Sequence, residues 1–276
     1  YQVMEKLNQY YSSALNKPDA QEARNYLAHR GLSEDIITRF SIGFVPTGWD
    51  NVLKRFGQSA DNKALLLEAG MVITNDNGRT YDRFRQRVMF PIRDRRGRVI
   101  AFGGRVLGDD LPKYLNSPET EIFHKGRQLY GLYEAQQSNN NVTKLLVVEG
   151  YMDVVALAQF GIDYAVASLG TSTTAEHIQL LFRTTDNIIC CYDGDRAGRD
   201  AAWRALETAL PFLNDGRSLR FMFLPEGDDP DSLVRREGKE AFEKRMEQAH
   251  SLSEFLFDSL VPQVDLSTQE GNGKLY

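Results

Sequence analysis

The sequence has few of the residues that build zinc sites, disulfide frameworks or membrane spans. Its 276 residues include two cysteines, adjacent at Cys190-Cys191, and four scattered histidines. Neighbouring side chains of a strand point to opposite faces, so we expect the cysteines to be buried apolar residues rather than a disulfide or a metal pair, and we expect no zinc site. No apolar run approaches the roughly 20 residues that span a bilayer, and no signal peptide opens the chain, which predicts no contact with a membrane.

Basic residues are outnumbered by acidic ones overall, but many of them are concentrated in one segment. Lys and Arg number 33 against 38 Asp and Glu, and the net charge of −5 alone does not suggest a nucleic-acid binder. Between Arg79 and Arg98, however, eight arginines stand against two aspartates, a local charge of +6. Such segregation lets an acidic protein bind a phosphate backbone through one face. In a strand, Arg83, Arg85 and Arg87 would share one face, which either binds phosphates or is simply solvated.

The second half of the chain alternates short apolar runs with helical patterns. Strands are predicted at 145–148, 164–167, 188–192 and 219–224, and residues with apolar positions at helical spacing lie between them. This alternation is typical of βαβ units around a parallel sheet that helices cover.

Acidic residues follow three of these predicted strands. Glu149 ends the first run, Asp193 and Asp195 follow the third, and an acidic cluster at 226–231 follows the last. In an open parallel sheet the carboxyl ends of the strands lie at one edge, where ligands bind. Carboxylates packed together would be forced to take up protons, a cost that divalent cations remove, and carboxylate oxygens with water suit Mg²⁺ or Mn²⁺. We therefore predict a site for two or more such ions.

The acidic residues are expected to play different roles at this site. Glu149, Asp193 and Asp195 are the predicted catalytic residues, with Asp193 as the bridge between the ions. Asp153, one helical turn after Glu149, is expected to orient the site from behind the ligands. The predicted metal ligands are all carboxylates of this edge: Glu149, Asp193, Asp195, Asp229 and Asp231.

Two ordinary alternatives compete with the metal site. An acid after a strand often caps the next helix, and Asp193-Gly194-Asp195 could be a turn followed by an N-cap. An EF-hand fails, because Ala197 stands at the fifth loop position and Arg204 stands where the bidentate glutamate should be. Three strand ends that share the pattern favour the metal site over coincidence.

Four short motifs carry a resemblance to a known family. The placement of Glu149-Gly150 and Asp193-x-Asp195 after strands resembles the Toprim fold shared by bacterial primases, topoisomerases and some nucleases. The motifs themselves closely resemble the catalytic core of DnaG-type bacterial primases: Glu-Gly-Tyr-Met-Asp-Val (149–154), Ser-Leu-Gly-Thr (168–171), Asp-Gly-Asp-Arg-Ala-Gly (193–198) and Asp-Asp-Pro-Asp (228–231).

The fold class that we expect is α/β, or α+β for the chain as a whole. Residues 1–126 are predicted to form a basic α+β subdomain, and 127–240 a Toprim-type parallel sheet flanked by helices that binds the metals. Residues 241–276 are expected to begin a helical subdomain that is truncated here, with no firm structure expected after about 265. Such primases usually carry an N-terminal zinc module and a C-terminal helicase-binding module; neither is evident, so the chain resembles an excised core.

The N-terminal subdomain is predicted to be mainly helical to about residue 70, with a loop at 43–49. A hairpin is expected from strands at 85–92 and 99–106, in which Gly103-Gly104 would let a ligand approach the backbone closely. Residues 136–143, with three Asn, are predicted to be a polar linker. Most aromatic residues of the first 70 are assigned to the core, including Tyr10, Tyr26, Phe40 and Trp49.

By resemblance, basic residues of this subdomain hold the template and the incoming nucleotide. Arg105, Lys113, Tyr114, Asn116 and Lys125 match the basic motif of the family, and Lys113 and Lys125 flank a short loop bounded by Pro118. On sequence alone these would be chance lysines of a solvated loop. Arg30 is a further candidate by resemblance and otherwise an ordinary helix-end cation. With the alternating arginines, the candidate template and nucleotide contacts are Arg30, Arg83, Arg85, Arg87, Arg105, Lys113, Tyr114, Asn116 and Lys125.

The resemblance implies that the chain joins ribonucleotides on single-stranded DNA into short RNA primers, by two-metal nucleotidyl transfer. It implies a monomer in the bacterial cytoplasm, associated with the nucleoid, that meets the replicative helicase through a module outside this chain and works near single-stranded DNA-binding protein. Two other classes stay open. A Toprim nuclease or topoisomerase fragment would use the same acids to cut a strand, and a non-catalytic Toprim module would bind DNA without metal-dependent turnover.

Overall fold

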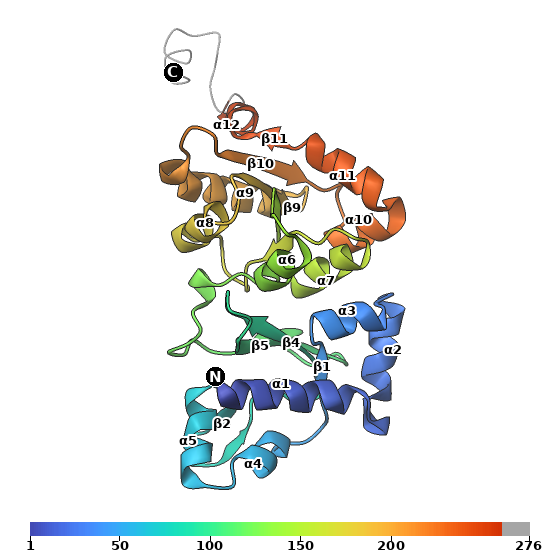
Figure 1. Ribbon diagram of the computed structural model, residues 1–276, viewed down its shortest axis with the longest axis vertical. Helices are drawn as coiled ribbons and strands as arrows, with labels where there is room; N and C mark the ends of the chain where they lie inside the picture. The colour runs from blue at the N-terminus through green and yellow to red at the C-terminus, as the bar shows by residue number, and fades with distance from the viewer. Residues whose placement is uncertain (261–276) are drawn as a thin grey trace.

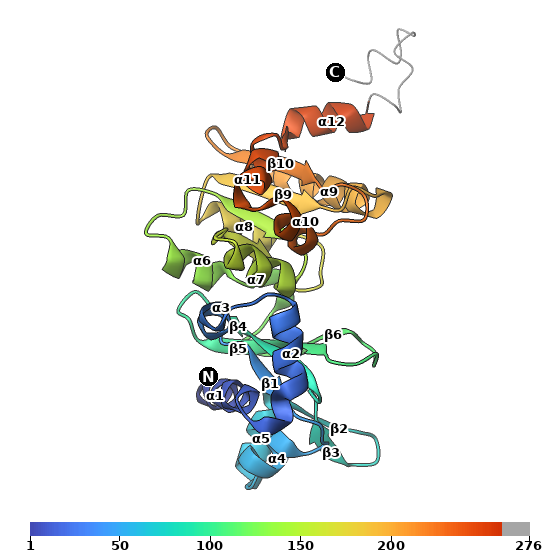
Figure 2. The ribbon, with the colours of Figure 1, turned by 90° about the vertical axis from the view of Figure 1, so that its right-hand side faces the viewer.

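The computed structural model describes residues 1–260 of the chain, so the prediction for the residues after 265 lies outside the described part. The described residues form an elongated molecule in which the N-terminal and C-terminal halves follow one another along the long axis (Figures 1 and 2). Each half is built around its own sheet. Among residues 1–260, no helix combines the length and the apolar character that crossing a membrane requires.

The N-terminal half surrounds a four-stranded antiparallel sheet with strand order β1-β4-β5-β6. Its strands are β1 (Gly43–Val45), β4 (Arg87–Arg93), β5 (Val99–Val106) and β6 (Tyr114–Asn116), and β2 (Val72–Thr74) pairs separately with β3 (Thr80–Asp82). The helices are α1 (Gln2–Leu15), η1 (Pro18–Ala20), α2 (Gln21–His29), α3 (Glu34–Arg39), α4 (Asn51–Phe56), α5 (Ala60–Glu68) and η2 (Lys125–Arg127).

The C-terminal half contains a five-stranded sheet with strand order β11-β10-β9-β7-β8, parallel except for β11. The strands are β7 (Leu145–Val148), β8 (Ala165–Ala167), β9 (Asn187–Tyr192), β10 (Ser218–Phe223) and β11 (His250–Ser251). The helices are α6 (Leu132–Ser138), α7 (Tyr151–Gln159), α8 (Ala175–Phe182), α9 (Arg196–Ala209), η3 (Leu210–Phe212), α10 (Pro230–Glu237), α11 (Lys239–Glu247) and α12 (Leu252–Leu260). The predicted parallel sheet is therefore confirmed, and β11 adds an edge strand that the sequence did not predict.

Helices cover both faces of the parallel sheet, and buried apolar side chains of β7 and β9 lie on both faces. Along β7, Leu145 packs in a core with α8 and α9, whereas Leu146 packs on the other face with α7. Cys190 and Cys191 divide between the same two cores and are both buried and free. The prediction that they are buried apolar residues on opposite faces is thus confirmed.

Four local predictions for the N-terminal half and the linker are wrong. Residues 43–45 form β1 rather than a loop, and a three-residue strand is too short to show a period of two. Residues 83–86 lie between β3 and β4, so the three alternating arginines do not share a strand face. Trp49 is 54% exposed instead of buried, although Phe40 is in the core. The first three residues of the predicted linker, 136–138, belong to α6.

The two halves share one hydrophobic core across their junction. The ring of Tyr151 on α7 stacks on Phe90 of β4, with 5.5 Å between centroids and 8° between planes, and it meets Tyr130 edge-on at 4.9 Å. A Cβ atom on Gly103 of β5 would lie within 2.4–2.6 Å of the Tyr151 ring. The prediction that this glycine admits a ligand is therefore wrong, because it makes room for a side chain of the protein itself.

Replacing Gly103 with Ala should lower the free energy of unfolding by about 1–3 kcal/mol, because an added methyl group overpacks a fitted core. Urea unfolding followed by circular dichroism measures this change. Gly108→Ala is the matched control, since a Cβ atom there would meet nothing within 4 Å and the backbone is not left-handed. Equal stability of the two variants would contradict the shared core at this position.

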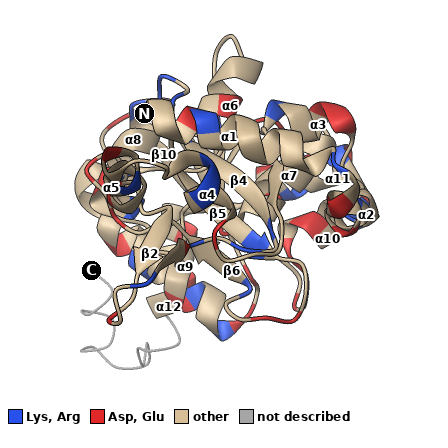
Figure 3. Ribbon diagram, turned by 90° about the horizontal axis from the view of Figure 1, so that it is seen from below, with Lys and Arg blue, Asp and Glu red and all other residues tan. Residues whose placement is uncertain are grey.

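Acidic and basic residues are interspersed along the ribbon in both halves rather than divided between them (Figure 3). The net charge of −5 therefore does not predict the local charge of any one surface, which depends on the residues that form that surface.

Candidate metal and nucleotide site

The acids predicted as metal ligands leave the sheet at the same edge. Glu149 directly follows β7 and Asp193 directly follows β9, and these strands pair in parallel with Val147 opposite Cys190. Asp229 lies in the loop after β10, which pairs in parallel with β9. Three adjacent strands thus deliver carboxylates to one place, as the sequence predicted.

The glycine between the two aspartates of the motif allows this convergence. A Cβ atom on Gly194 would lie 2.1 Å from the carbonyl oxygen of Leu224, at the end of β10. No side chain fits there, because the Cβ atom would collide with the backbone and not with the flexible end of a side chain. Gly194 therefore lets the turn that carries Asp193 pack directly on the segment that leads to Asp229.

Among residues 1–260, Glu149 and Asp193 have no cationic partner. Partial burial raises the pKa of Glu149, and the negative charges of Asp193 and Asp195 raise it further. Partial burial likewise raises the pKa of Asp193, together with the charges of Asp195 and Asp229. Within residues 1–260 neither side chain makes a hydrogen bond or an ion pair. Both carboxylates are therefore poised to accept a cation.

The helix-cap alternative holds for two of the other acids. Asp195 Oδ1 accepts a hydrogen bond of 2.7 Å from the backbone N–H of Gly198 and caps α9. Asp229 Oδ1 accepts one of 2.7 Å from the N–H of Ser232 and caps α10. Each cap uses one carboxylate oxygen, and in the described residues the second oxygen of each has no hydrogen bond. Capping and metal binding are compatible for both residues.

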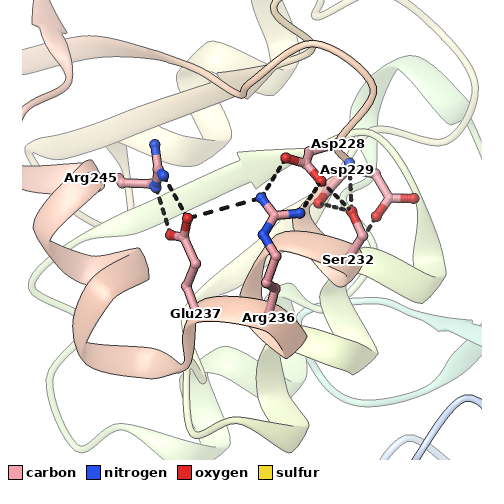
Figure 4. A network of polar contacts seen from close by, with 6 residues as sticks. All are labelled: Asp228, Asp229, Ser232, Arg236, Glu237 and Arg245. Atoms are coloured by element: carbon pink, nitrogen blue, oxygen red, sulfur yellow. Dashed lines mark hydrogen bonds and ion pairs between the residues drawn. The ribbon is translucent and has the colours of Figure 1, made fainter.

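The acidic loop before α10 is held by a polar network (Figure 4). Arg236 donates to both oxygens of Asp228, at 2.7 and 2.6 Å, and also lies 4.0 Å from Glu237. Glu237 in turn accepts two hydrogen bonds from Arg245. Asp228 is thereby neutralised, whereas its neighbour Asp229 keeps an open oxygen for the site.

Asp231 and Asp153 lie behind these carboxylates. Asp231 is buried and forms ion pairs with Arg30 of the N-terminal half and with Arg235 of α10. Its two oxygens are thus engaged by guanidinium groups, and its role as a metal ligand stays a prediction. Asp153 Oδ2 accepts the backbone N–H of Gly150 at 3.1 Å, next to Glu149. Burial, with the charges of Asp229 and Asp231, raises the pKa of Asp153 to about 7.

The donor set fits Mg²⁺ rather than an ion that needs a closed protein cage. Among residues 1–260, no three His, Cys, Asp or Glu side chains lie in an arrangement that could by itself enclose a metal ion. Mg²⁺ keeps several waters and is commonly bound through one or two carboxylates. Glu149 and Asp193, with the open oxygens of Asp195 and Asp229, supply such a set.

Residues of the N-terminal half face this acidic edge. Tyr114 of β6 lies close enough to Arg105, Arg30 and Asp153 for their charges to act on its pKa, which burial raises. The guanidinium of Arg105 lies 4.2 Å from the ring centroid of Tyr26. The structure thus brings Arg30, Arg105 and Tyr114 to the acids, as the predicted site requires.

Asn116 joins the two halves through its side-chain amide. Its Oδ1 accepts a hydrogen bond from the hydroxyl of Tyr151, and its Nδ2 donates to the carbonyl of Leu169 at 3.1 Å. Lys113 precedes β6 and Lys125 opens η2, and within residues 1–260 neither ammonium group has an ion pair. The segment between Lys113 and Pro118 is mostly strand β6 rather than the predicted loop.

The three alternating arginines are separated by their environments. Arg87 is buried and donates to three backbone carbonyls, those of Gly104, Pro112 and Lys113, so it holds β4, β5 and the approach to β6 together. Arg83 donates to the carbonyl of Asn116 at 3.1 and 2.9 Å. Arg85 stacks on Trp49, with 4.0 Å from its guanidinium carbon to the ring centroid.

Two cavities lined by candidate residues were not predicted from the sequence. Exposed Trp49 lines a cavity of about 390 Å³ with Arg83 and Arg85, and the only signal for it was the nearby arginine cluster. A cavity of about 280 Å³ beside Glu149 is lined by Arg204 and by hydroxyl side chains of the loop between β8 and α8: Ser168, Thr171, Ser172 and Thr173. The Ser-Leu-Gly-Thr motif had marked this loop without giving it a role.

Comparisons with known proteins agree with this architecture. Residues 10–136 match the family model of the DNA primase catalytic core, N-terminal domain, and residues 146–234 match a Toprim-like model. The DNA primase of Escherichia coli (strain K12) is 74% identical over 275 residues, which are 100% of this chain and 47% of that protein. The DNA primase of Pasteurella multocida is 63% identical over 277 residues, with the same coverage. The chain thus spans about half the length of the curated relatives it matches.

Solved structures show the same fold. The structure of the DnaG primase catalytic domain bound to ssDNA has a TM-score of 0.97 and 73% identity, and the match covers 100% of this chain and 89% of that one. The RNA polymerase domain of Mycobacterium tuberculosis primase DnaG in complex with double-stranded DNA has a TM-score of 0.83 and 31% identity, covering 99% and 88%. The chain therefore belongs to the family of DnaG-type primase catalytic cores.

Proposed function

We propose that the chain makes short RNA primers on single-stranded DNA, as the nucleotidyl-transferring core of a DNA primase. Two carboxylates that have no ion pair in the described part of the chain, Glu149 and Asp193, lie at the same edge as cationic residues of the N-terminal half, and this observation carries the proposal. A polymerising site needs both: acids for metal ions, and cations for a polyanionic substrate. Membership of the primase family selects primer synthesis among the reactions of such a site.

Each residue of the site has a proposed task in this reaction. Glu149 and Asp193 would hold two Mg²⁺ ions, with the open oxygens of Asp195 and Asp229 completing the set. The ions, when bound, lower the pKa of the attacking ribose hydroxyl and neutralise charge on the leaving pyrophosphate. Asp153 orients the backbone beside Glu149 through its hydrogen bond to Gly150. Lys125 and Arg105 hold triphosphate or template phosphates.

We propose the corresponding partners and setting. The template is single-stranded DNA, the substrates are ribonucleoside triphosphates, and a divalent metal ion, Mg²⁺ or Mn²⁺, is the cofactor. The core works as a monomer in the bacterial cytoplasm near the nucleoid, where single-stranded DNA-binding protein covers the template. The replicative helicase would be met through a module outside this chain. The bound ssDNA in the related DnaG catalytic domain supports the template assignment.

Incubation of the chain with single-stranded DNA, labelled ribonucleotides and Mg²⁺ tests the function directly. Short RNA products that disappear when EDTA removes the metal are expected. Cleavage of the DNA would instead favour the nuclease class, and tight DNA binding without any metal-dependent product would favour a non-catalytic module.

The template is expected to enter along Trp49, Arg83 and Arg85, which line one cavity. Replacing Arg83 and Arg85 with Gln should reduce the slope of log affinity against log salt for single-stranded DNA by roughly 1.4, because each lost phosphate contact removes about 0.7. Fluorescence anisotropy at several salt concentrations measures the slope. Arg87 is left unchanged because its buried contacts are structural. A wild-type slope in the double variant would show that neither arginine contacts the phosphates of the template.

Lys113 is proposed to bind the nucleotide rather than the template. Its exposed ammonium group has no ion pair in residues 1–260, and it stands one residue before Tyr114, which faces the acidic edge. Lys113→Ala should raise the KM for ribonucleotides about 10-fold, the loss expected for one charge-assisted contact to phosphate of about 1.5 kcal/mol. Affinity for single-stranded DNA should stay unchanged. Lost DNA affinity with an unchanged KM would move Lys113 to the template side.

A further inference from the structure

Five arginine side chains gather in a second place, away from the acidic edge. They come from the turn between β4 and β5, from η2 and from the end of α8, and they line a shallow cavity of about 320 Å³ with Asp94, Gln128 and Leu180. We call this cavity the arginine hollow; its arginines are Arg95, Arg96, Arg98, Arg127 and Arg183. The role proposed above for the basic residues of the chain uses none of them.

Positive charge in the arginine hollow is almost uncompensated. Among the described residues that line it, Asp94 is the one carboxylate. Asp94 is already paired with Arg98 at 2.7 Å and accepts hydrogen bonds from the backbone N–H groups of Arg96 and Arg98. Arg98 also stacks on Tyr1, with 3.8 Å between its guanidinium carbon and the ring centroid. The other four make no ion pair and no side-chain hydrogen bond within residues 1–260: Arg95, Arg96, Arg127 and Arg183.

Four unpaired guanidinium groups around one hollow repel one another, and that repulsion is relieved by a bound polyanion. Arg is well suited to phosphate, because its planar fork donates two parallel hydrogen bonds and its charge is weakly hydrated. A chain with a net charge of −5 does not collect unpaired arginines merely to balance its own acids, since 38 Asp and Glu are available as partners. A phosphodiester backbone, with a charge at each nucleotide, fits such a row of donors.

The arginine hollow is connected to the acidic edge by short, rigid elements. Lys125 and Arg127 belong to the same turn, η2, and Gly126 between them accepts a hydrogen bond of 2.5 Å from Thr174 Oγ1 at the start of α8. The loop just before Thr174 lines the cavity beside Glu149, and Arg183 follows the last residue of α8. An eight-residue helix spans about 12 Å, so the hollow begins near the site and extends roughly one helix length beyond it.

We propose that the arginine hollow is a second phosphate-binding site, which holds the backbone of the nucleic acid a few nucleotides away from the metal ions. At a rise of about 3.4 Å per nucleotide along one strand of a duplex, 12 Å corresponds to three or four nucleotides. The proposal rests on the function proposed above, because that function places the reacting end of the nucleic acid at the metal ions. Its ligand chemistry, a chain of phosphodiesters, is shared by the single-stranded template and by the RNA–DNA duplex that synthesis creates.

Binding measured without nucleotides or metal tests the proposal separately from catalysis. Two double variants remove arginines of the hollow: the first is Arg95→Gln/Arg96→Gln and the second is Arg127→Gln/Arg183→Gln. The control is Lys6→Gln/Lys244→Gln, which removes the same charge from exposed lysines that have no ion pair within residues 1–260. The ligands are single strands of about three and about 20 nucleotides and an RNA–DNA duplex of about 20 base pairs, each titrated at several salt concentrations.

Each arginine pair should weaken binding of a long ligand about 10-fold and reduce its salt slope by roughly 1.4 to 1.8, at 0.7 per phosphate for a single strand and 0.9 for a duplex. The short strand should bind as before, because it occupies only the primary site. Loss confined to the long single strand identifies the template as the ligand, and loss confined to the duplex identifies the product. Unchanged slopes for both long ligands, or equal losses with the short strand and the lysine control, would overturn the second site. Failure of primer synthesis by the wild-type chain would instead contradict the proposed function and leave these slopes intact.

Discussion

Replacing Asp193 with Asn should lower the rate of primer synthesis by at least about 10²-fold, the loss expected when a major electrostatic element of an active site is removed. Asp193 follows the central strand β9, and its carboxylate has no partner in residues 1–260. Partial burial raises its pKa, and so do the charges of two other carboxylates, those of Asp195 and Asp229. Asn keeps the shape of the side chain but removes the charge that would hold a cation.

Two readouts separate this loss from a folding defect. The free energy of unfolding without metal should stay equal or rise in Asp193→Asn, because the substitution relieves repulsion between carboxylates. Mg²⁺ at 100 times its dissociation constant should stabilise the wild-type chain by about 2.7 kcal/mol and the variant by much less, since only a folded site binds the ion. Asp186→Asn is the matched control, because Asp186 precedes the same strand at the opposite edge of the sheet. Near-wild-type synthesis by Asp193→Asn would refute the metal site.

The sequence predicted the part of the site that follows from strand order. Apolar runs of four to six residues that alternate with helices indicate central strands of a parallel sheet, so the positions just after β7 and β9 were expected at one edge. Glu149 and Asp193 were found in this way, and the parallel pairing of the strands confirms their placement. The helix caps of Asp195 and Asp229 were also foreseeable, since an acid before a helix often caps it.

The residues that the sequence misplaced are those whose partners are distant in the chain. In the sequence, Arg87 resembles an exposed member of an alternating series. In the structure it is buried, and its guanidinium group donates hydrogen bonds to three backbone carbonyls that are 17 to 26 residues away in the chain. Trp49 looks like a core residue, yet it lies on the surface beneath Arg85. Periodicity reports which face of an element a residue occupies, but a buried guanidinium or an exposed indole depends on contacts that only the folded chain creates.

Asp231 shows the same limit in the site itself, and it gives a second large effect. Its buried carboxylate pairs with Arg30, 201 residues earlier, and with Arg235 one turn later on α10. Arg235 also donates to the backbone carbonyl of Arg30, so this cluster ties the end of α2 to α10. The sequence placed Arg30 and Asp231 in separate roles, one on phosphate and one on metal, because no local pattern signals a pair across the two halves.

Replacing Asp231 with Asn should lower the free energy of unfolding by roughly 2–4 kcal/mol. This loss is no larger than that of breaking a fully buried pair, because the two guanidinium groups are about one-third exposed and water partly solvates them. Asp228→Asn is the control, since water screens the pair of Asp228 with Arg236 at the surface and its loss should change stability little. Urea unfolding with and without Mg²⁺ distinguishes the two roles of Asp231. A loss of stability that is the same in both conditions assigns it to the bridge between the halves. An unchanged stability without metal, combined with a weaker response to Mg²⁺, would show instead that Asp231 leaves its arginines to bind the ion.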